Sequence, residues 1–238
     1  MLRGDEWRWW PLAPWLLWQG LAARTRVPRL PPVVDRVGEC EGSAPALDLI
    51  ALGDSTIAGV GCVTQSEALT GSTARYLASR SGRAVRWRAH GVSGLTAAGI
   101  RRTLLPGALQ YAPDVVVLSV GVNDAVRGRA PADFAADLAA IVDALLAAAN
   151  ERGRTVRVIY AGMPPMGCFP ALQWPLAGLL AARAVALAAA AADALEGRAA
   201  VVRFPAALDR DTFASDGFHP GPVGCARWSE WVGALALR

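Results

Sequence analysis

The sequence predicts a three-layer α/β domain in which about five parallel strands form one sheet with helices on both faces. Short apolar runs rich in β-branched residues alternate with longer helical stretches. The strongest runs are continuously apolar, as expected of strands that are buried on both faces. Hydrophobic residues make up 53% of the 238 residues and charged residues 18%. This composition argues against extensive disorder, and the length suits one domain with an additional arm.

Five segments carry the strand predictions. The strongest three each end in glycine and are LDLIALG (47–53), DVVVLSVG (114–121) and TVRVIYAG (155–162); the weaker two are AVRWRAHG (84–91) and AAVVRF (199–204). Helices are expected at about 65–81, 96–109, 131–151, 176–196 and 222–237. Thr64 and Glu67 fit a capping box at the start of the first of these helices. Right-handed crossovers between parallel strands then place functional residues just beyond the carboxyl ends of the strands.

Residues 1–45 differ in composition from the α/β domain predicted at 46–238. Five of the nine tryptophans lie in this arm, and prolines follow them at Pro28, Pro31 and Pro32. We prefer the interpretation that these residues form an arm that packs across the domain. An interfacial membrane segment ranks second, and a cleaved signal peptide ranks third. Asp5 and Glu6 do not fit a basic signal-peptide start, and the apolar run is too short for a transmembrane helix. We expect a cytoplasmic protein, with export or peripheral membrane contact through residues 1–45 as alternatives.

Charge and cysteine usage exclude several classes of chemistry. All 24 basic residues are arginines, so P-loop, Schiff-base and Ser–Lys mechanisms are excluded. The arginines are scattered along the chain rather than clustered, so no nucleic-acid partner is expected. The four cysteines lack a CxxC pair and any metal-ligand spacing. We expect buried thiols, no metal and no cofactor; the pairing of the cysteines and the oligomeric state stay open.

A candidate nucleophile and base stand at two of the expected loops. Ser55 follows the first strong strand in GDST, and Gly53 allows a tight turn before it. His219 lies in SDGFHP with Asp216 three residues before it, a spacing that puts two side chains on one face of a turn. Asp216 would then orient the imidazole that activates Ser55. The rival base, His90, ends a strand with no acid near it in sequence, and we expect it to pack beside the pocket.

Donors for an oxyanion follow two other strands. Gly94 in GVSGLT (91–96) offers a backbone N–H that no Cβ shields, and Asn123 in GVND (121–124) offers a side-chain N–H. The N–H of Ser55 would be a third donor. Each of these signals also has a local reading as a turn or a helix cap.

Together, GDST, GVSGLT, GVND and DGFHP resemble the first, second, third and fifth sequence blocks of the SGNH hydrolases, also called the GDSL esterase/lipase family. The resemblance spans residues 47–238 and leaves the arm outside. It implies a flavodoxin-like fold with five parallel strands and no metal. It also implies Ser55 as nucleophile, His219 as base, Asp216 as its partner, and Gly94 and Asn123 as oxyanion donors. Two positions depart from the family pattern: Thr56 replaces leucine, and His90 stands where asparagine often precedes the glycine of the second block.

The substrate prediction rests on the loop MPPMGCFPALQWPL (163–176). Its apolar side chains would form an acyl or alcohol wall beside Ser55, with Met163, Met166, Phe169 and Trp174 as the candidate contacts. The same loop could instead only cap the sheet edge. The predicted function is a serine esterase acting on small-molecule carboxylic esters with a hydrophobic part. Alternatives are an acyltransferase or thioesterase on the same site, or a membrane-associated non-catalytic binding protein. A nucleotide-binding module is a further alternative, because GVGCVT (59–64) resembles GxGxxG. The third glycine of that motif is missing, however, and the second strand has no acidic residue at its end to bind a ribose.

Overall fold

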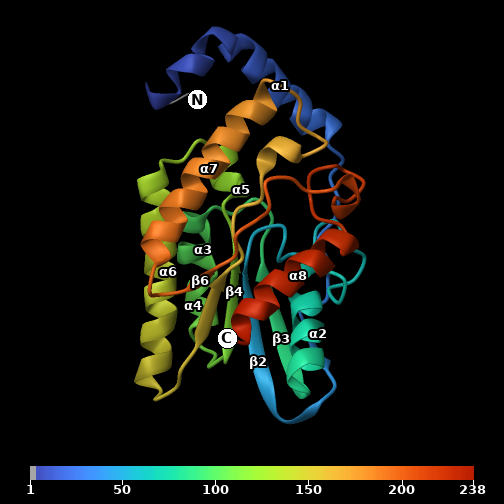
Figure 1. Cartoon of the computed structure of the whole chain (residues 1–238), viewed down its shortest axis with the longest axis vertical. Helices are drawn as coiled ribbons and strands as arrows, with labels where there is room; N and C mark the ends of the chain where they lie inside the picture. Colours follow the sequence, from blue (N-terminus) through green and yellow to red (C-terminus); the bar gives the residue numbers. More distant parts are fainter. Residues whose placement is uncertain (1–3) are drawn as a thin grey trace.

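A six-stranded, mostly parallel sheet forms the centre of the computed structural model, which describes residues 4–238 (Figure 1). The strand order is β1-β3-β2-β4-β5-β6. Its strands are β1 (Val37–Cys40), β2 (Ser43–Gly53), β3 (Arg83–Gly91), β4 (Val115–Ser119), β5 (Arg157–Tyr160) and β6 (Ala200–Val201). The edge strand β1 runs antiparallel to β3, and all other pairs are parallel. The carboxyl ends of the five parallel strands therefore meet at one edge of the sheet.

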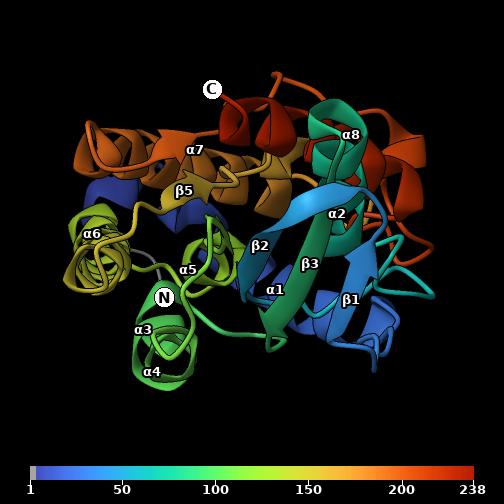
Figure 2. The same cartoon turned by 90° about the horizontal axis from the view of Figure 1, so that it is seen from below.

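Helices cover both faces of this sheet, which confirms the predicted fold class (Figure 2). One face carries α2 (Leu69–Ser81) and α8 (Pro222–Ala236); the other carries α3 (Ala97–Thr103), α4 (Leu105–Ala108), α6 (Pro131–Glu151) and α7 (Leu176–Leu195). The short α5 (Val122–Val126) follows β4. Side chains of β2 alternate between two cores, because successive strand residues point to opposite faces. Leu49 and Ala51 join the core under α2 and α8, whereas Ile50 and Leu52 join the core under α3, α6 and α7.

The expected elements are present with changed boundaries, and each change has a local cause. The helix expected at 96–109 is divided into α3 and α4, with Pro106 in the first turn of α4, where its missing N–H is tolerated. The helix expected from residue 65 begins at Leu69 instead. The Glu67 carboxylate does accept the backbone N–H of Thr64, at 3.3 Å, but this bond closes a separate turn before α2. The predicted capping box is therefore not the start of that helix.

The N-terminal arm consists of a 3₁₀ segment, η1 (Gly4–Leu12), and the helix α1 (Ala13–Arg26), and it lies across one end of the molecule (Figure 1). Two polar anchors attach it to the domain. Glu6 forms an ion pair with Arg183 of α7, with Oε2 2.8 Å from Nη2. Gln19 donates to the carbonyl of Trp174 at 2.9 Å and accepts the N–H of Leu176 at 3.0 Å. Residues 27–36 have no regular secondary structure and lead into β1, which forms one edge of the sheet beside β3.

Among the described residues, α7 is the one helix whose length and composition would allow it to cross a membrane. Its side chains Leu180, Leu187 and Leu195 are buried in the core that it shares with α6. We therefore interpret α7 as a core helix of the α/β domain.

Candidate active site

Ser55 lies at the carboxyl edge of the sheet, two residues after the end of β2. Gly53 is needed there for space, because an added Cβ would lie 2.4 Å from both Ile57 Cγ1 and the carbonyl oxygen of Ser119. Residues 54–61 form consecutive turns, in which the N–H of Ala58 bonds to Asp54 O at 3.0 Å. Ser55 thus begins a short turn of backbone and not α2, which starts fourteen residues later at Leu69.

His219 and Asp216 reach Ser55 from the loop before α8. His219 Nε2 lies 3.1 Å from Ser55 Oγ, and His219 Nδ1 lies 2.6 Å from Asp216 Oδ2. The other oxygen of Asp216 accepts the backbone N–H groups of Phe218 and His219 at 2.9 and 3.0 Å. An antiparallel bridge between Phe213 and Pro220 closes the base of this loop. The structure therefore joins the three predicted residues in one chain of hydrogen bonds.

The environment of Asp216 favours its charged form. Burial by itself would raise the pKa of this carboxyl, but hydrogen bonds from the His219 side chain and from the backbone N–H groups of His219 and Phe218 outweigh that effect. The pKa of Asp216 is therefore below its ordinary value. A carboxylate that stays ionised holds the proton of His219 on Nδ1, which leaves Nε2 free to accept the Ser55 proton.

Of the two expected oxyanion donors, Gly94 lies in the loop after β3 and Asn123 lies in α5, directly after β4, where it is engaged in other bonds. Its Nδ2 lies 3.2 Å from Asp54 Oδ2 and 3.1 Å from the carbonyl oxygen of Leu95. Gly94 has a φ of 84°, a region that favours glycine, and the turn it makes leads into α3. Its carbonyl accepts a hydrogen bond from Arg127 at 2.9 Å.

Asp54 is a site residue that the sequence reading did not assign. It is 3% exposed, accepts the backbone N–H of Thr56 at 3.1 Å, and accepts the side chain of Asn123. Burial raises its pKa to about 6, against the hydrogen bonds that favour the charged form. The sequence GDST places Asp54 directly before Ser55. Its partner, however, lies 69 residues away in sequence, and nothing local indicates that pairing.

An apolar cavity of about 180 Å³ opens beside Ser55 and His219. Its aromatic lining comes from the segment between β5 and α7, from the loops before η3 (Arg210–Thr212) and α8, and from α8 itself, and consists of Phe169, Phe204, Phe213, Phe218, Trp228 and Trp231. Arg227 stands in the lining and forms an ion pair with Asp209, 2.8 Å between Nη1 and Oδ2. The site can therefore hold an uncharged, hydrophobic group next to the hydroxyl of Ser55.

The predicted substrate wall needs correction at three of its four residues. Phe169 lines the cavity, as the loop reading expected. Met163 and Met166 are instead buried in the core under α6 and α7, where Met163 packs against Gly121. Trp174 is 70% exposed and lies outside the cavity lining. The loop forms the 3₁₀ turn η2 (Met166–Cys168) after Pro165, and the carbonyl of Trp174 is hydrogen-bonded to Gln19 of the arm.

His90 is placed apart from the hydrogen-bonded chain. It ends β3, where its ring lies 5.7 Å from that of Tyr111, and it is not part of the cavity lining. Burial, with Arg88 and Arg36 nearby, lowers its pKa. His219 is therefore the histidine that faces Ser55. The four cysteines are free thiols, and Cys62 and Cys225 lie in contact, 3.8 Å between their sulfurs.

Comparisons with known proteins agree with this geometry. Residues 51–227 match the GDSL-like lipase/acylhydrolase family, a range that contains every candidate catalytic residue. The GDSL-like esterase Rv1075c of Mycobacterium tuberculosis is 29% identical over 248 residues, which cover 94% of this chain and 76% of that protein. Among solved structures, the lipase Lip_vut3 from a goat rumen metagenome superposes with a TM-score of 0.68 at 18% identity, covering 79% of this chain and 97% of that one. TesA gives a TM-score of 0.63 at 24% identity with the same coverage. At these identities, the two structural likenesses establish the fold.

Proposed function

This chain belongs to the GDSL-like lipase/acylhydrolase family and is a serine-type carboxylic ester hydrolase, and from the site geometry we propose that Ser55, His219 and Asp216 perform its reaction. The observation that carries the proposal is the chain of hydrogen bonds from Ser55 Oγ to His219 and from His219 to Asp216, at 3.1 and 2.6 Å. Nucleophile, base and orienting acid in this order are the parts that acyl transfer requires.

The reaction proceeds in two halves that use the same groups. His219 Nε2 takes the proton of Ser55 as Oγ attacks the ester carbonyl, and the imidazolium that forms is stabilised by Asp216. His219 then gives its proton to the leaving alcohol, so the C–O bond of the ester breaks and an acyl-enzyme remains. A water molecule, deprotonated by His219, attacks this acyl group, and Ser55 leaves with the proton as the carboxylic acid is released.

The negative charge of each tetrahedral intermediate needs donors at the sheet edge. We assign this role to the backbone N–H groups of Ser55 and Gly94 and to the side-chain amide of Asn123. Asp54 holds that amide at 3.2 Å and so fixes its position before substrate binds. The aromatic cavity is the proposed binding place for the hydrophobic part of the ester.

The test uses a fluorophosphonate probe, which bonds covalently to an activated serine, together with hydrolysis of p-nitrophenyl esters. We expect the label on Ser55, and we expect Ser55→Ala to lose labelling and to lower kcat by about 10⁶-fold with the fold retained by circular dichroism. Ser93→Ala is the matched control, because Ser93 is an exposed serine at the same edge. Labelling of another residue, or full hydrolysis by Ser55→Ala, would refute the assignment. Added alcohol acceptors distinguish hydrolysis from acyl transfer through the products formed.

A further inference from the structure

Large apolar side chains are exposed on the outward face of the N-terminal arm. Trp7, Trp10, Trp15, Leu17, Trp18 and Leu21 are each more than half exposed. Among the described residues of η1 and α1, the buried ones are Leu16, the polar Gln19 and the charged Glu6, and the two polar side chains attach the arm to the domain. An ordinary surface helix shows the opposite pattern, with its apolar stripe towards the core. The arm is thus held by these polar groups together with Leu16 and Trp9, which packs against Gly178, and it presents most of its large apolar side chains outward.

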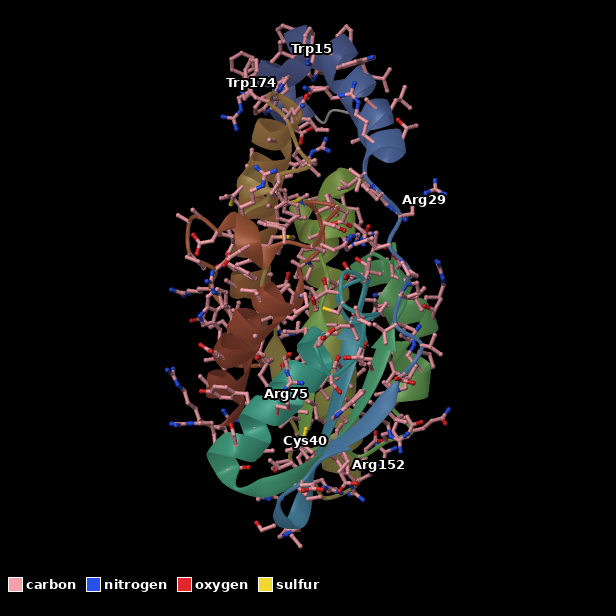
Figure 3. All side chains as sticks on the ribbon, turned by 90° about the vertical axis from the view of Figure 1, so that its right-hand side faces the viewer. Trp15, Arg29, Cys40, Arg75, Arg152 and Trp174 are labelled. Atoms are coloured by element: carbon pink, nitrogen blue, oxygen red, sulfur yellow. The ribbon has the colours of Figure 1, made fainter. Side chains whose placement is uncertain are left out.

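This outward face continues onto the loop that follows β5. Trp174 is 70% exposed and lies at the same end of the molecule as Trp15 (Figure 3). The two hydrogen bonds of Gln19, to the carbonyl of Trp174 and from the N–H of Leu176, join the arm to this loop. The same loop contains Phe169, which lines the cavity beside Ser55. The arm and one wall of the site therefore form a connected unit.

The charges of the arm favour an anionic surface. Residues 1–30 contain five arginines and two acidic residues, and one of those acids, Glu6, faces Arg183. Arg26 lies over the ring of Trp18 at 5.5 Å, and Arg8 over that of Trp9 at 5.8 Å. Tryptophan side chains partition to the boundary between lipid and water, and arginines there attract anionic headgroups. A protein partner would need a complementary shape, whereas a bilayer needs only an apolar, basic face at an end of the molecule.

We propose that the outward face of residues 7–29, with Trp174, docks this enzyme onto anionic lipid bilayers. The aromatic rings enter the headgroup boundary, and the arginines contact the lipid phosphates. This proposal does not depend on the chemistry at Ser55, since none of the docking residues belongs to the hydrogen-bonded chain.

The experiment is flotation of the full-length protein with vesicles of phosphatidylglycerol and phosphatidylcholine, compared with phosphatidylcholine alone. The wild type is expected to float with the anionic vesicles and to dissociate at high salt. Trp15→Ser/Trp18→Ser should lower the partition coefficient by about tenfold or more, since each ring removed from the bilayer forfeits its transfer energy. Arg26→Gln/Arg29→Gln should weaken binding to the anionic vesicles and leave binding to phosphatidylcholine vesicles unchanged. Val63→Ser/Tyr111→Ser is the matched control, as it removes exposed apolar groups outside the arm.

Ser55→Ala should float like the wild type, so a failure of the catalytic assignment and a failure of docking are distinguished. Docking is not needed for the Trp double variant to fold, and its melting temperature checks that it does fold. The Arg double variant provides a second test of docking. Failure of the wild type to float, or unchanged flotation of both double variants, would overturn the proposal. So would a wild-type dimer that the Trp substitutions convert to a monomer without any vesicle binding, since the face would then join two copies of this chain.

Discussion

Asn123, the proposed side-chain donor to the oxyanion, already makes two hydrogen bonds in this structure. A side-chain amide nitrogen has two hydrogens, and Asp54 and the Leu95 carbonyl lie within 3.2 Å of it. To stabilise an oxyanion, Asn123 must share one of these hydrogens or exchange the Leu95 contact for the substrate. The bond to Asp54 is the one that survives such an exchange, because it is made in a buried environment to a carboxylate.

Replacing Asn123 tests its role as a donor. Asn123→Ala is expected to lower kcat by about 10²- to 10³-fold with little change in KM, because the lost bond acts on the transition state. The measurement is steady-state hydrolysis of a p-nitrophenyl ester. Asn150→Ala serves as the control, because Asn150 is an exposed asparagine in the last turn of α6, outside the cavity lining. A loss of less than fivefold would show that backbone N–H groups alone stabilise the oxyanion.

Residue-scale features were predictable where the signal was local. Asp216 and His219 are three positions apart, and a chain with two histidines leaves few candidates for a base, so the sequence predicted the group that the structure brings to Ser55. Their catalytic roles stay predictions. The pairing of Asp54 with Asn123 and the burial of Met163 and Met166 depend on contacts between distant segments, which no local pattern encodes.

Among the structural elements, continuous apolar strands were the easiest to predict. β2, β4 and β5 are buried on both faces and carry β-branched residues, so sequence and structure agree on them. The edge strand β1 was not expected, because its four residues, VGEC, are half exposed and have no apolar period. The loop between β6 and α8 was also missed as a cavity wall. Its Phe204, Leu208 and Phe213 line the cavity together with residues of α8, and this contact between segments has no local sequence pattern.

This aromatic wall predicts a preference for longer acyl groups. Each methylene that enters an apolar cavity contributes about 0.8 kcal/mol, so kcat/KM is expected to rise roughly fourfold per methylene from acetate until the cavity is filled. A series of p-nitrophenyl acetate, butyrate, hexanoate and octanoate measures this dependence. If acetate were the preferred ester, the cavity beside Ser55 would not be the acyl site.

The contact between η1 and α7 can be tested in a similar way. Glu6 and Arg183 are both largely buried, and removing one partner of such a pair typically costs about 3–5 kcal/mol. Arg183→Ala is therefore expected to release the arm and to raise the rate of tryptic cleavage at Arg8, Arg26 and Arg29 by about 10²-fold. Arg198→Ala is the control, because Arg198 pairs with Asp143 at the surface, where such pairs contribute little. Equal cleavage rates in the two variants would mean that Gln19 and the apolar contacts hold the arm without this pair.

For the molecule as a whole, the carboxyl edge of the sheet carries buried charge that costs stability. Asp54 is 3% exposed and Asp124 is fully buried, where it faces Arg129 and accepts the N–H of Ala97. Burial raises the pKa of each to about 6. Such acids bind protons more readily in the folded chain than in the unfolded one. Their contribution to stability is therefore fully present below about pH 3.8 and is lost as the pH rises through 6. Asp216 has the opposite sign, because its pKa is lowered and its contribution appears as the pH rises.

Comparing variants with the wild type isolates this cost. Asp54→Asn and Asp124→Asn replace a carboxyl that must ionise with a neutral amide of the same shape, whereas Asp216 contributes equally to both proteins and cancels. The free energy of unfolding of each variant, relative to the wild type, is expected to increase between pH 4 and pH 7. A pKa rise from 3.8 to about 6 sets the upper limit of that increase at about 3 kcal/mol. Urea unfolding at several pH values measures the difference, with the exposed Asp143→Asn as control. The opposite result would be a variant that becomes less stable than the wild type as the pH rises. It would show that the hydrogen bonds from Thr56, Asn123 and Ala97 outweigh the effect of burial on the carboxyl pKa values. This edge of the sheet would then stabilise the two charges rather than tolerate them.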